Sequence, residues 1–193
     1  MRVGVLTSKK DFKNHQRMLA QCGMDGVLIV KLPDFDDIDG FILPDDYRAS
    51  ISWKDQDPIK KRIEEIAQQD TPIFGIGNGL VLLAQEVINE GEDYCFGLLD
   101  IKMNRYGLNL FSGKYTEIPL KIDVLGKAPF PGIFIEAPTV QSMQPNVGIL
   151  AMHQEKIVMV RQGNILGSSF HPELADDLRV YLYFKQMIKD AKK

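Results

Sequence analysis

Short apolar runs alternate with segments of helical periodicity through the first half of the chain. Four apolar runs predict strands: Arg2–Thr7, Gly26–Leu32, Asp39–Pro44 and Pro72–Ile76. Three segments with apolar residues at helical spacing predict helices: Asp11–Cys22, Pro58–Gln69 and Leu80–Asn89. This β-α-β-β-α-β-α order is typical of a parallel sheet covered by helices.

The second half has the pattern of strands joined by tight turns. Six segments are strand-like: Gly97–Met103, Tyr115–Ile122, Ile133–Glu136, Val147–Met152, Lys156–Arg161 and Ile165–Phe170. A helix is predicted at Asp176–Lys189. With no linker and no internal repeat, we expect one domain over residues 1–193, an α/β three-layer sandwich around a mixed, largely parallel sheet.

Composition and charge exclude several classes of function. The net charge is −3 and no basic block occurs, so a nucleic-acid partner is not expected. No apolar stretch approaches the ~20 residues of a membrane span, and the start of the chain lacks the pattern of a signal peptide. The two cysteines, Cys22 and Cys95, match no metal or redox spacing. We expect a cytoplasmic protein without a metal, a cofactor or a membrane partner.

One segment has the form of a nucleophile elbow. Phe74–Leu80 joins a predicted strand to a predicted helix with the pattern G-x-Nuc-x-G, and Gly77 stands in the nucleophile position. Such a turn exposes one side chain and one free backbone N–H for an oxyanion. Glycine relieves the strain of the turn but has no side chain that attacks a substrate.

A second segment carries a candidate base. In Ser169–Leu174, a predicted strand ends near His171 and Glu173 follows two residues later. A carboxylate at this spacing can orient an imidazole that acts as general base. The nucleophile is missing, because Cys22 is predicted in a helix and Cys95 in a loop.

These residues resemble those of class I glutamine amidotransferases, whose motifs are a G-x-C-x-G elbow and a late H-P-E. The resemblance is strongest to the glutaminase subunit of pyridoxal 5′-phosphate synthase and covers nearly the whole chain. The matching stretches are Val3–Leu6, Asp39–Pro44, Gly97–Leu99, Gly132–Ile135, Ala137–Pro138 and the long run Gln162–Leu174. The resemblance implies a flavodoxin-like fold, release of ammonia from glutamine for vitamin B6 biosynthesis, and a barrel-shaped synthase subunit as partner.

The same comparison shows departures at the implied active site. The nucleophilic cysteine of the family falls on Gly77, while His171 and Glu173 match its base and the orienting carboxylate. The glycines of the family's P-G-G-E-S loop fall on Asp45 and Asp46, and an arginine that contacts glutamine falls on Glu136. The resemblance implies seven substrate-binding positions: Asp45, Asp46, Tyr47, Asn78, Arg105, Ile135 and Glu136.

Three hypotheses follow. The chain is a catalytically impaired or inactive glutaminase homologue that keeps its synthase partner, and its acidic pocket disfavours the α-carboxylate of glutamine. Alternatively, His171 activates a water molecule directly, assisted by Asp46 or Glu173. In a third hypothesis, the scaffold is a non-enzymatic ligand-binding or regulatory module whose acidic residues favour an amine.

Overall fold

A computed structural model describes residues 1–45, 57–91, 94–105, 107–108, 115–135 and 138–193 of the chain. The α-helices are α1 (Lys9–Gln21), α2 (Pro58–Gln68), α3 (Asn78–Leu83) and α4 (Arg179–Ala191), with 3-10 helices η1 (Leu32–Phe35) and η3 (Asp123–Leu125). The first strands are β1 (Arg2–Val5), β2 (Asp25–Leu28), β3 (Gly40–Leu43), β4 (Ile73–Ile76), β5 (Ala84–Val87) and β6 (Leu99–Asn104). The later strands are β7 (Thr116–Leu120), β8 (Phe130–Phe134), β9 (Thr139–Met143), β10 (Gly148–His153), β11 (Lys156–Gln162) and β12 (Ile165–Ser168).

A ten-stranded sheet connects the two halves of the chain. Its order is β2-β1-β3-β4-β12-β11-β9-β6-β5, and β10 pairs with β11. The five strands from β2 to β12 are mutually parallel, whereas β11 is antiparallel to β12, β9 and β10. Strands β7 and β8 form a separate antiparallel pair. The prediction of an α/β fold around a mixed sheet is therefore confirmed.

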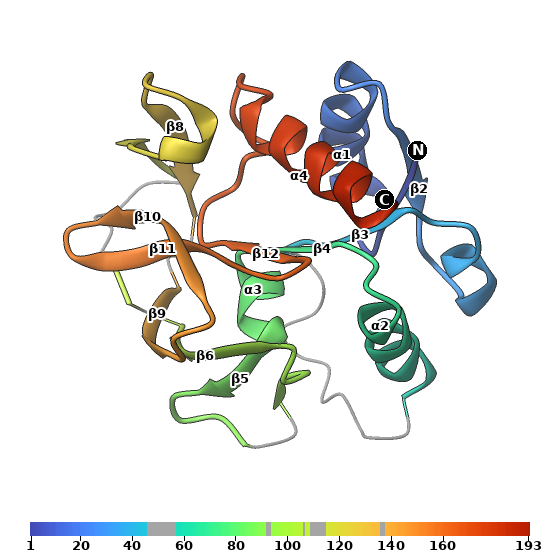
Figure 1. Cartoon of the computed structure of the whole chain (residues 1–193), viewed down its shortest axis with the longest axis horizontal. Coiled ribbons are helices and arrows are strands. Elements are labelled where there is room, and N and C mark those ends of the chain that lie inside the picture. The colour runs from blue at the N-terminus through green and yellow to red at the C-terminus, as the bar shows by residue number, and fades with distance from the viewer. Residues whose placement is uncertain (46–56, 92–93, 106, 109–114, 136–137) are drawn as a thin grey trace.

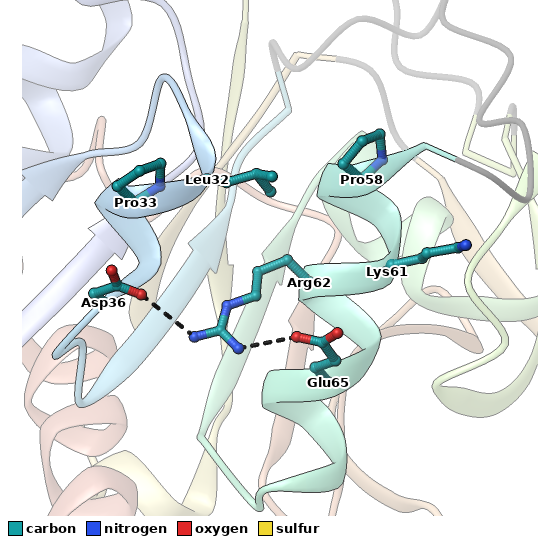
Figure 2. A pocket seen from close by; sticks show the side chains of 7 residues that line it. All are labelled: Leu32, Pro33, Asp36, Pro58, Lys61, Arg62 and Glu65. Atoms are coloured by element: carbon teal, nitrogen blue, oxygen red, sulfur yellow. Dashed lines mark hydrogen bonds and ion pairs between the residues drawn. The ribbon is translucent and has the colours of Figure 1, made fainter.

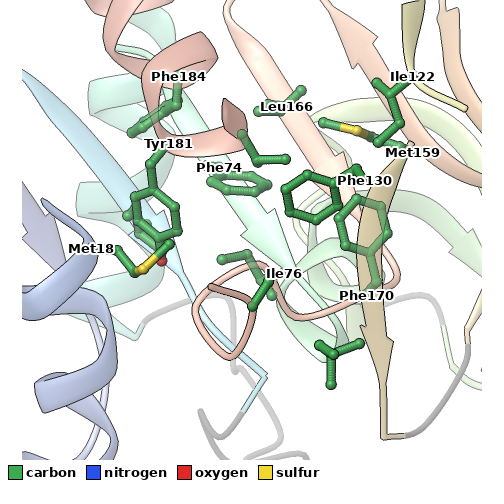
Figure 3. Packing of buried hydrophobic residues seen from close by; sticks show 14 of the residues in the cluster. Met18, Phe74, Ile76, Ile122, Phe130, Met159, Leu166, Phe170, Tyr181 and Phe184 are labelled. Carbon is green, nitrogen blue, oxygen red and sulfur yellow. The ribbon is translucent and has the colours of Figure 1, made fainter. Parts of the chain in front are cut away.

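Helices cover both faces of the parallel part of the sheet, which gives three layers (Figure 1). On one face, α1 and α4 pack with the β7–β8 pair in one apolar cluster, and α2 and α3 contribute to a second cluster on the other face. Phe74 of β4 lies against two rings of α4, at centroid distances of 6.4 Å from Tyr181 and 5.6 Å from Phe184 (Figure 3). The strands thus bury both faces, as strands of a covered parallel sheet do.

The centre of the sheet is its most apolar part. All residues of β3 and β4 are buried, and β4 pairs in parallel with β3 on one side and β12 on the other. Because parallel strands end at the same edge, the residues that follow these three strands lie close together. In an open α/β sheet this carboxyl edge is where ligands bind.

Two sequence predictions for the secondary structure are wrong. A helix was expected over Leu80–Asn89, but α3 ends at Leu83 and Ala84–Val87 forms β5, which pairs with β6. At Ala84 the backbone is already extended, with ψ 162°, because Ala84 itself pairs with Leu99 of β6. The strand β9 was not expected, although it joins β6 to β11 in the sheet.

Among the residues that the structure describes, no helix has the length and apolar character needed to cross a bilayer.

Replacing Phe184 with alanine should destabilise the fold strongly. Its side chain is fully buried against Phe74, so the substitution leaves a cavity and should lower the free energy of unfolding by about 3–5 kcal/mol. Leu182→Ala on the same helix is the matched control, because Leu182 is 46% exposed. Urea unfolding of both variants measures the difference; equal losses would contradict the packing of α4.

Candidate active site

The carboxyl ends of β3, β4 and β12 bring three predicted site segments together. Asp45 follows β3, Gly77 follows β4, and His171 and Glu173 follow β12. The sequence separations are large, but the strands are immediate neighbours in the sheet. The topology therefore gathers these groups at one edge.

Gly77 forms a sharp turn between β4 and α3. Its φ of 56° and ψ of −119° lie in a region that residues with a Cβ rarely adopt, and its N–H donates to Ser168 O at 2.8 Å. The flanking glycines permit close packing: a Cβ at Gly79 would overlap the carbonyl oxygen of Leu43, and one at Gly75 would lie 2.5 Å from Leu83 Cδ1. The elbow predicted from sequence thus has the expected strand-turn-helix form.

The side chain of Asp45 occupies the space over Gly77. A Cβ on Gly77 would lie 2.6 Å from Asp45 Oδ1 and 2.7 Å from its Cγ. The same Oδ1 accepts a hydrogen bond from the N–H of Asn78 at 2.6 Å. This N–H belongs to the residue after the elbow's central position, which is the usual oxyanion donor. The carboxylate of Asp45 therefore fills the side-chain space and engages the donor.

His171 and Glu173 form a buried pair. His171 Nδ1 lies 2.9 Å from Glu173 Oε1, and the two residues are 2% and 6% exposed. Burial opposes ionisation of Glu173, but the hydrogen bond from His171 and the nearby imidazoles of His15 and His171 hold the pKa of Glu173 below its ordinary value of 4.5. An ionised carboxylate only accepts, so Nδ1 donates to it.

The other ring nitrogen of His171 faces the elbow. His171 Nε2 lies 3.7 Å from Asp45 Oδ2, so the imidazole stands between two carboxyl groups. In a base–nucleophile pair, this nitrogen would face the nucleophile. Here Nε2 faces the carboxylate of Asp45. Histidine activates a thiol or a hydroxyl by taking its proton, and a carboxylate is not activated in this way.

His15 belongs to the site, although the sequence did not single it out. It is 2% exposed, and its Nδ1 lies 2.7 Å from Tyr181 Oη. Burial raises the pKa of Tyr181 well above 10, so its hydroxyl stays protonated and can donate. The helical spacing of His15 from buried Met18 and Leu19 was the signal that could have revealed its inward position.

Arg105 approaches the elbow from β6. Its Nη2 donates to Asn78 Oδ1 at 3.3 Å and its Nη1 to Glu90 Oε1 at 3.1 Å. The guanidinium also lies over the ring of Tyr94, 5.4 Å from the centroid. The structure thus joins two of the predicted substrate-binding residues, Arg105 and Asn78, through their side chains.

The remaining predicted positions are only partly described. Asp46, Tyr47 and Glu136 lie outside the described residues, so their places in the site stay predictions. Ile135 follows β8, is 46% exposed and lines the same cavity as Asp45 and His171.

Neither cysteine lies at this edge of the sheet. Cys22 follows α1, and its carbonyl oxygen accepts from Lys185. Cys95 precedes β6, and its thiol donates to Gln85 O at 3.4 Å. Burial raises the pKa of both thiols. Neither cysteine is among the described residues that line the cavity beside His171.

The cavity beside His171 has a volume of about 120 Å³ and is formed by α1, the end of β3 and the segment after β12. A wider groove of about 560 Å³ lies between η1 and α2 (Figure 2). Its wall includes Arg62, which pairs with Asp36 at 3.7 Å and Glu65 at 3.0 Å. This groove shares no lining residue with the cavity beside His171.

Within the described part of the chain, no group of three or more His, Cys, Asp or Glu side chains could hold a metal ion.

Comparisons with known proteins agree on one family. Residues 5–190 match the SNO glutamine amidotransferase family. The chain is 39% identical over 195 residues to "Pyridoxal 5′-phosphate synthase subunit PdxT" of Thermotoga petrophila, covering 98% of this chain and all of that protein. It is 37% identical over 191 residues to the protein of the same name from Moorella thermoacetica, covering 97% and 100%. A solved glutamine amidotransferase superposes with a TM-score of 0.84 at 27% identity, covering 97% of this chain and 98% of the other.

Replacing Gly79 with alanine should destabilise the protein by at least about 3 kcal/mol, because the added methyl group overlaps the backbone oxygen of Leu43. Gly91→Ala is the matched control, since a Cβ there meets nothing within 4 Å. Chemical unfolding of both variants tests the close approach of α3 to β3; a mild effect at Gly79 would show that the turn relaxes easily.

The ionisation of Glu173 should make stability depend on pH. Its pKa in the folded state is lower than the unfolded value, so its contribution is complete above about pH 4.5 and is lost as the pH falls through the folded pKa. The stability advantage of the native protein over Glu173→Gln should therefore shrink as the pH falls below about 4.5 and through the lowered pKa of the folded state. Glu117→Gln, at an exposed position, serves as control. An advantage that grows on acidification would contradict the assignment.

Proposed function

Because the chain belongs to the SNO glutamine amidotransferase family, we propose that it is a homologue of the glutaminase subunit of pyridoxal 5′-phosphate synthase whose glutaminase activity is lost or severely impaired. In this proposal Gly77 occupies the position of the nucleophilic cysteine. Without a side chain there, no thioester with the glutamine carbonyl forms.

The observation that carries the proposal is the position of the Asp45 carboxylate. It fills the space that a side chain at residue 77 would need and takes the Asn78 N–H. A substrate carbonyl that entered the site would have to displace this carboxylate from the donor. The charge of Asp45 also disfavours the negative charge that develops on the carbonyl oxygen during attack.

His171 and Glu173 keep a base-like arrangement, but Gly77 offers no side chain for the base to activate. Their 2.9 Å contact and their burial support a retained structural pair that holds the segment after β12. Direct activation of water by His171 is the weaker hypothesis, because Asp45 Oδ2 stands 3.7 Å from the nitrogen that would take the proton. The alternative of a separate regulatory module has no support from the comparisons.

We extend the proposal to the partner. Relatives that this chain matches over nearly their whole length are named as subunits of pyridoxal 5′-phosphate synthase. A chain that keeps the scaffold can keep the docking surface for the synthase subunit after losing its chemistry. Its role would then be to occupy or stabilise that complex.

The native protein and Gly77→Cys, each mixed with the synthase subunit, should release no ammonia from glutamine above background. Loss of a catalytic nucleophile reduces turnover by at least about 10⁴-fold. In Gly77→Cys the new thiol lies against the Asp45 carboxylate, which crowds it and raises its pKa. Enzyme-coupled ammonia detection and a pull-down on the same sample separate loss of chemistry from loss of docking.

The contribution of Asp45 is isolated by the double variant Gly77→Cys/Asp45→Gly. Its introduced thiol should react with iodoacetamide at least about tenfold faster than in Gly77→Cys, because one pKa unit changes the thiolate fraction about tenfold. The native protein provides the background from Cys22 and Cys95. Equal alkylation rates would show that Asp45 does not control the reactivity of a thiol at residue 77. Robust glutamine turnover by the native protein would refute the proposal.

A further inference from the structure

The carboxylate of Asp45 lies where the side chain of an elbow nucleophile would lie. Its Oδ1 is 2.6 Å from the position of a Cβ on Gly77, although Asp45 follows β3 and Gly77 follows β4. Asp45 lines the cavity beside His171, and its side chain is 22% exposed. A carboxylate is a nucleophile of covalent catalysis that needs no base to remove a proton from it. The space left by the missing cysteine thus contains a nucleophile of another kind.

The two oxygens of this carboxylate have different neighbours. Oδ1 accepts a hydrogen bond from the Asn78 N–H at 2.6 Å, and Oδ2 lies 3.7 Å from His171 Nε2. On the far side of the imidazole, His171 Nδ1 lies 2.9 Å from Glu173 Oε1. Nucleophile, imidazole and orienting carboxylate therefore follow in the order of a catalytic triad, with the oxyanion donor on the nucleophile itself.

We propose that Asp45 is the nucleophile of a hydrolysis that converts small, neutral, primary alkyl halides into alcohols, with His171 as the base of its second step. In the first step Asp45 Oδ2 attacks the carbon that bears the halogen. A carbon–oxygen bond forms, the carbon–halogen bond breaks with its electron pair, and the products are an alkyl ester of Asp45 and a halide ion.

In the second step a water molecule gives a proton to His171 Nε2 and its oxygen attacks Cγ of the ester. The bond from Cγ to the alkylated oxygen then breaks, and the alcohol leaves with the proton that His171 held. The acid so formed loses its proton to solvent and is again a carboxylate. The sum is alkyl halide and water to alcohol, halide and a proton.

The hydrogen bond from Asn78 determines the class of substrate. This N–H is occupied by Asp45 Oδ1, so it is not available to the carbonyl oxygen of an amide or ester substrate. Attack on a saturated carbon develops no oxyanion on the substrate and needs no such donor. Negative charge develops on Oδ1 only when water adds to Cγ, and there the N–H is already in place. The same contact therefore disfavours glutamine and favours an alkyl substrate.

The cavity limits the size and charge of that substrate. Its volume of about 120 Å³ is well below the roughly 300–1,000 Å³ of sites for larger ligands, which restricts the substrate to a few carbon atoms. Ile135 and Leu174 give the cavity apolar contacts, whereas Asp11 and Glu173 make it acidic and repel anionic substrates. Asn14 in the lining carries amide N–H donors for a departing halide, which needs no proton to leave.

The hydrolytic water enters only after the first step. In the resting protein His171 Nε2 is buried and faces the Asp45 carboxylate. Formation of the ester removes the negative charge of Asp45 and with it the attraction to the imidazole. The ester group then moves away from Nε2, and water takes the place between Nε2 and Cγ.

This activity goes beyond the proposed function and does not depend on it. Alkyl halide hydrolysis requires neither glutamine nor the synthase subunit, so it is measured on the isolated chain. Ammonia release from glutamine would refute the proposed loss of glutaminase activity, whereas the fate of the halide tests Asp45 alone.

The first test uses the native protein with bromoethane as the probe. Bromide release is followed by ion chromatography, and a single turnover is run in water enriched in oxygen-18 with protein in excess. We expect bromide release above the rate in buffer, label in the Asp45 peptide and unlabelled ethanol. Label in ethanol but not in Asp45 would show that water attacks the halide directly, and this result or the absence of bromide release would overturn the proposal.

Variants separate the two steps. Asp45→Ala should lower bromide release at least about 10⁴-fold, as loss of a nucleophile does. His171→Gln should release bromide once and then accumulate an ethyl ester, which peptide mass spectrometry locates on Asp45. Glu117→Gln, at an exposed position outside the cavity, should turn over as the native protein does. Undiminished release by folded Asp45→Ala, or no ester in folded His171→Gln, would contradict the mechanism. Circular dichroism checks the folding of each variant, and the labelling experiment decides the question without them.

Discussion

The hydrogen bond from the Asn78 N–H to the Asp45 carboxylate sets the character of this edge of the sheet. It holds a negative charge over Gly77, in the space that a side chain would need, and beside the imidazole of His171. The bond is possible because β3 and β4 are adjacent and parallel, so the residues after them meet. This hydrogen bond, more than the His171–Glu173 pair, therefore limits which reactions the site can support.

The sequence predicted the parallel half of the fold well, since β3 and β4 are continuous apolar runs with clear ends. It failed over Leu80–Asn89, where apolar residues at helical spacing pack as α3 only to Leu83 before the chain pairs with β6. That pairing depends on a partner strand distant in sequence, which local periodicity does not reveal. The same limitation explains the missed strand β9, whose pairing with β6 and β11 is entirely non-local.

Motif spacing predicted the location of Gly77, His171 and Glu173 because a strand-turn-helix and an H-x-E segment are local patterns. The resemblance to a family placed Asp45 in the pocket, but its contact with the elbow required three-dimensional packing. The sequence did not reveal His15, because the group that allows this polar side chain to be buried is the hydroxyl of Tyr181, 166 residues further along the chain. The proximity of His15 to Glu173 could not be predicted from the sequence and is seen only in the folded structure.

The two glycines that flank Gly77 are needed for close packing, independently of any catalytic role. Gly79 is required by the nearness of the Leu43 carbonyl, and Gly75 by the side chain of Leu83. Selection for a well-packed interior is therefore enough to preserve both, whatever stands between them. A search for the paired glycines alone therefore detects the architecture of the turn, and the residue enclosed by the pair decides whether the turn also presents a side chain.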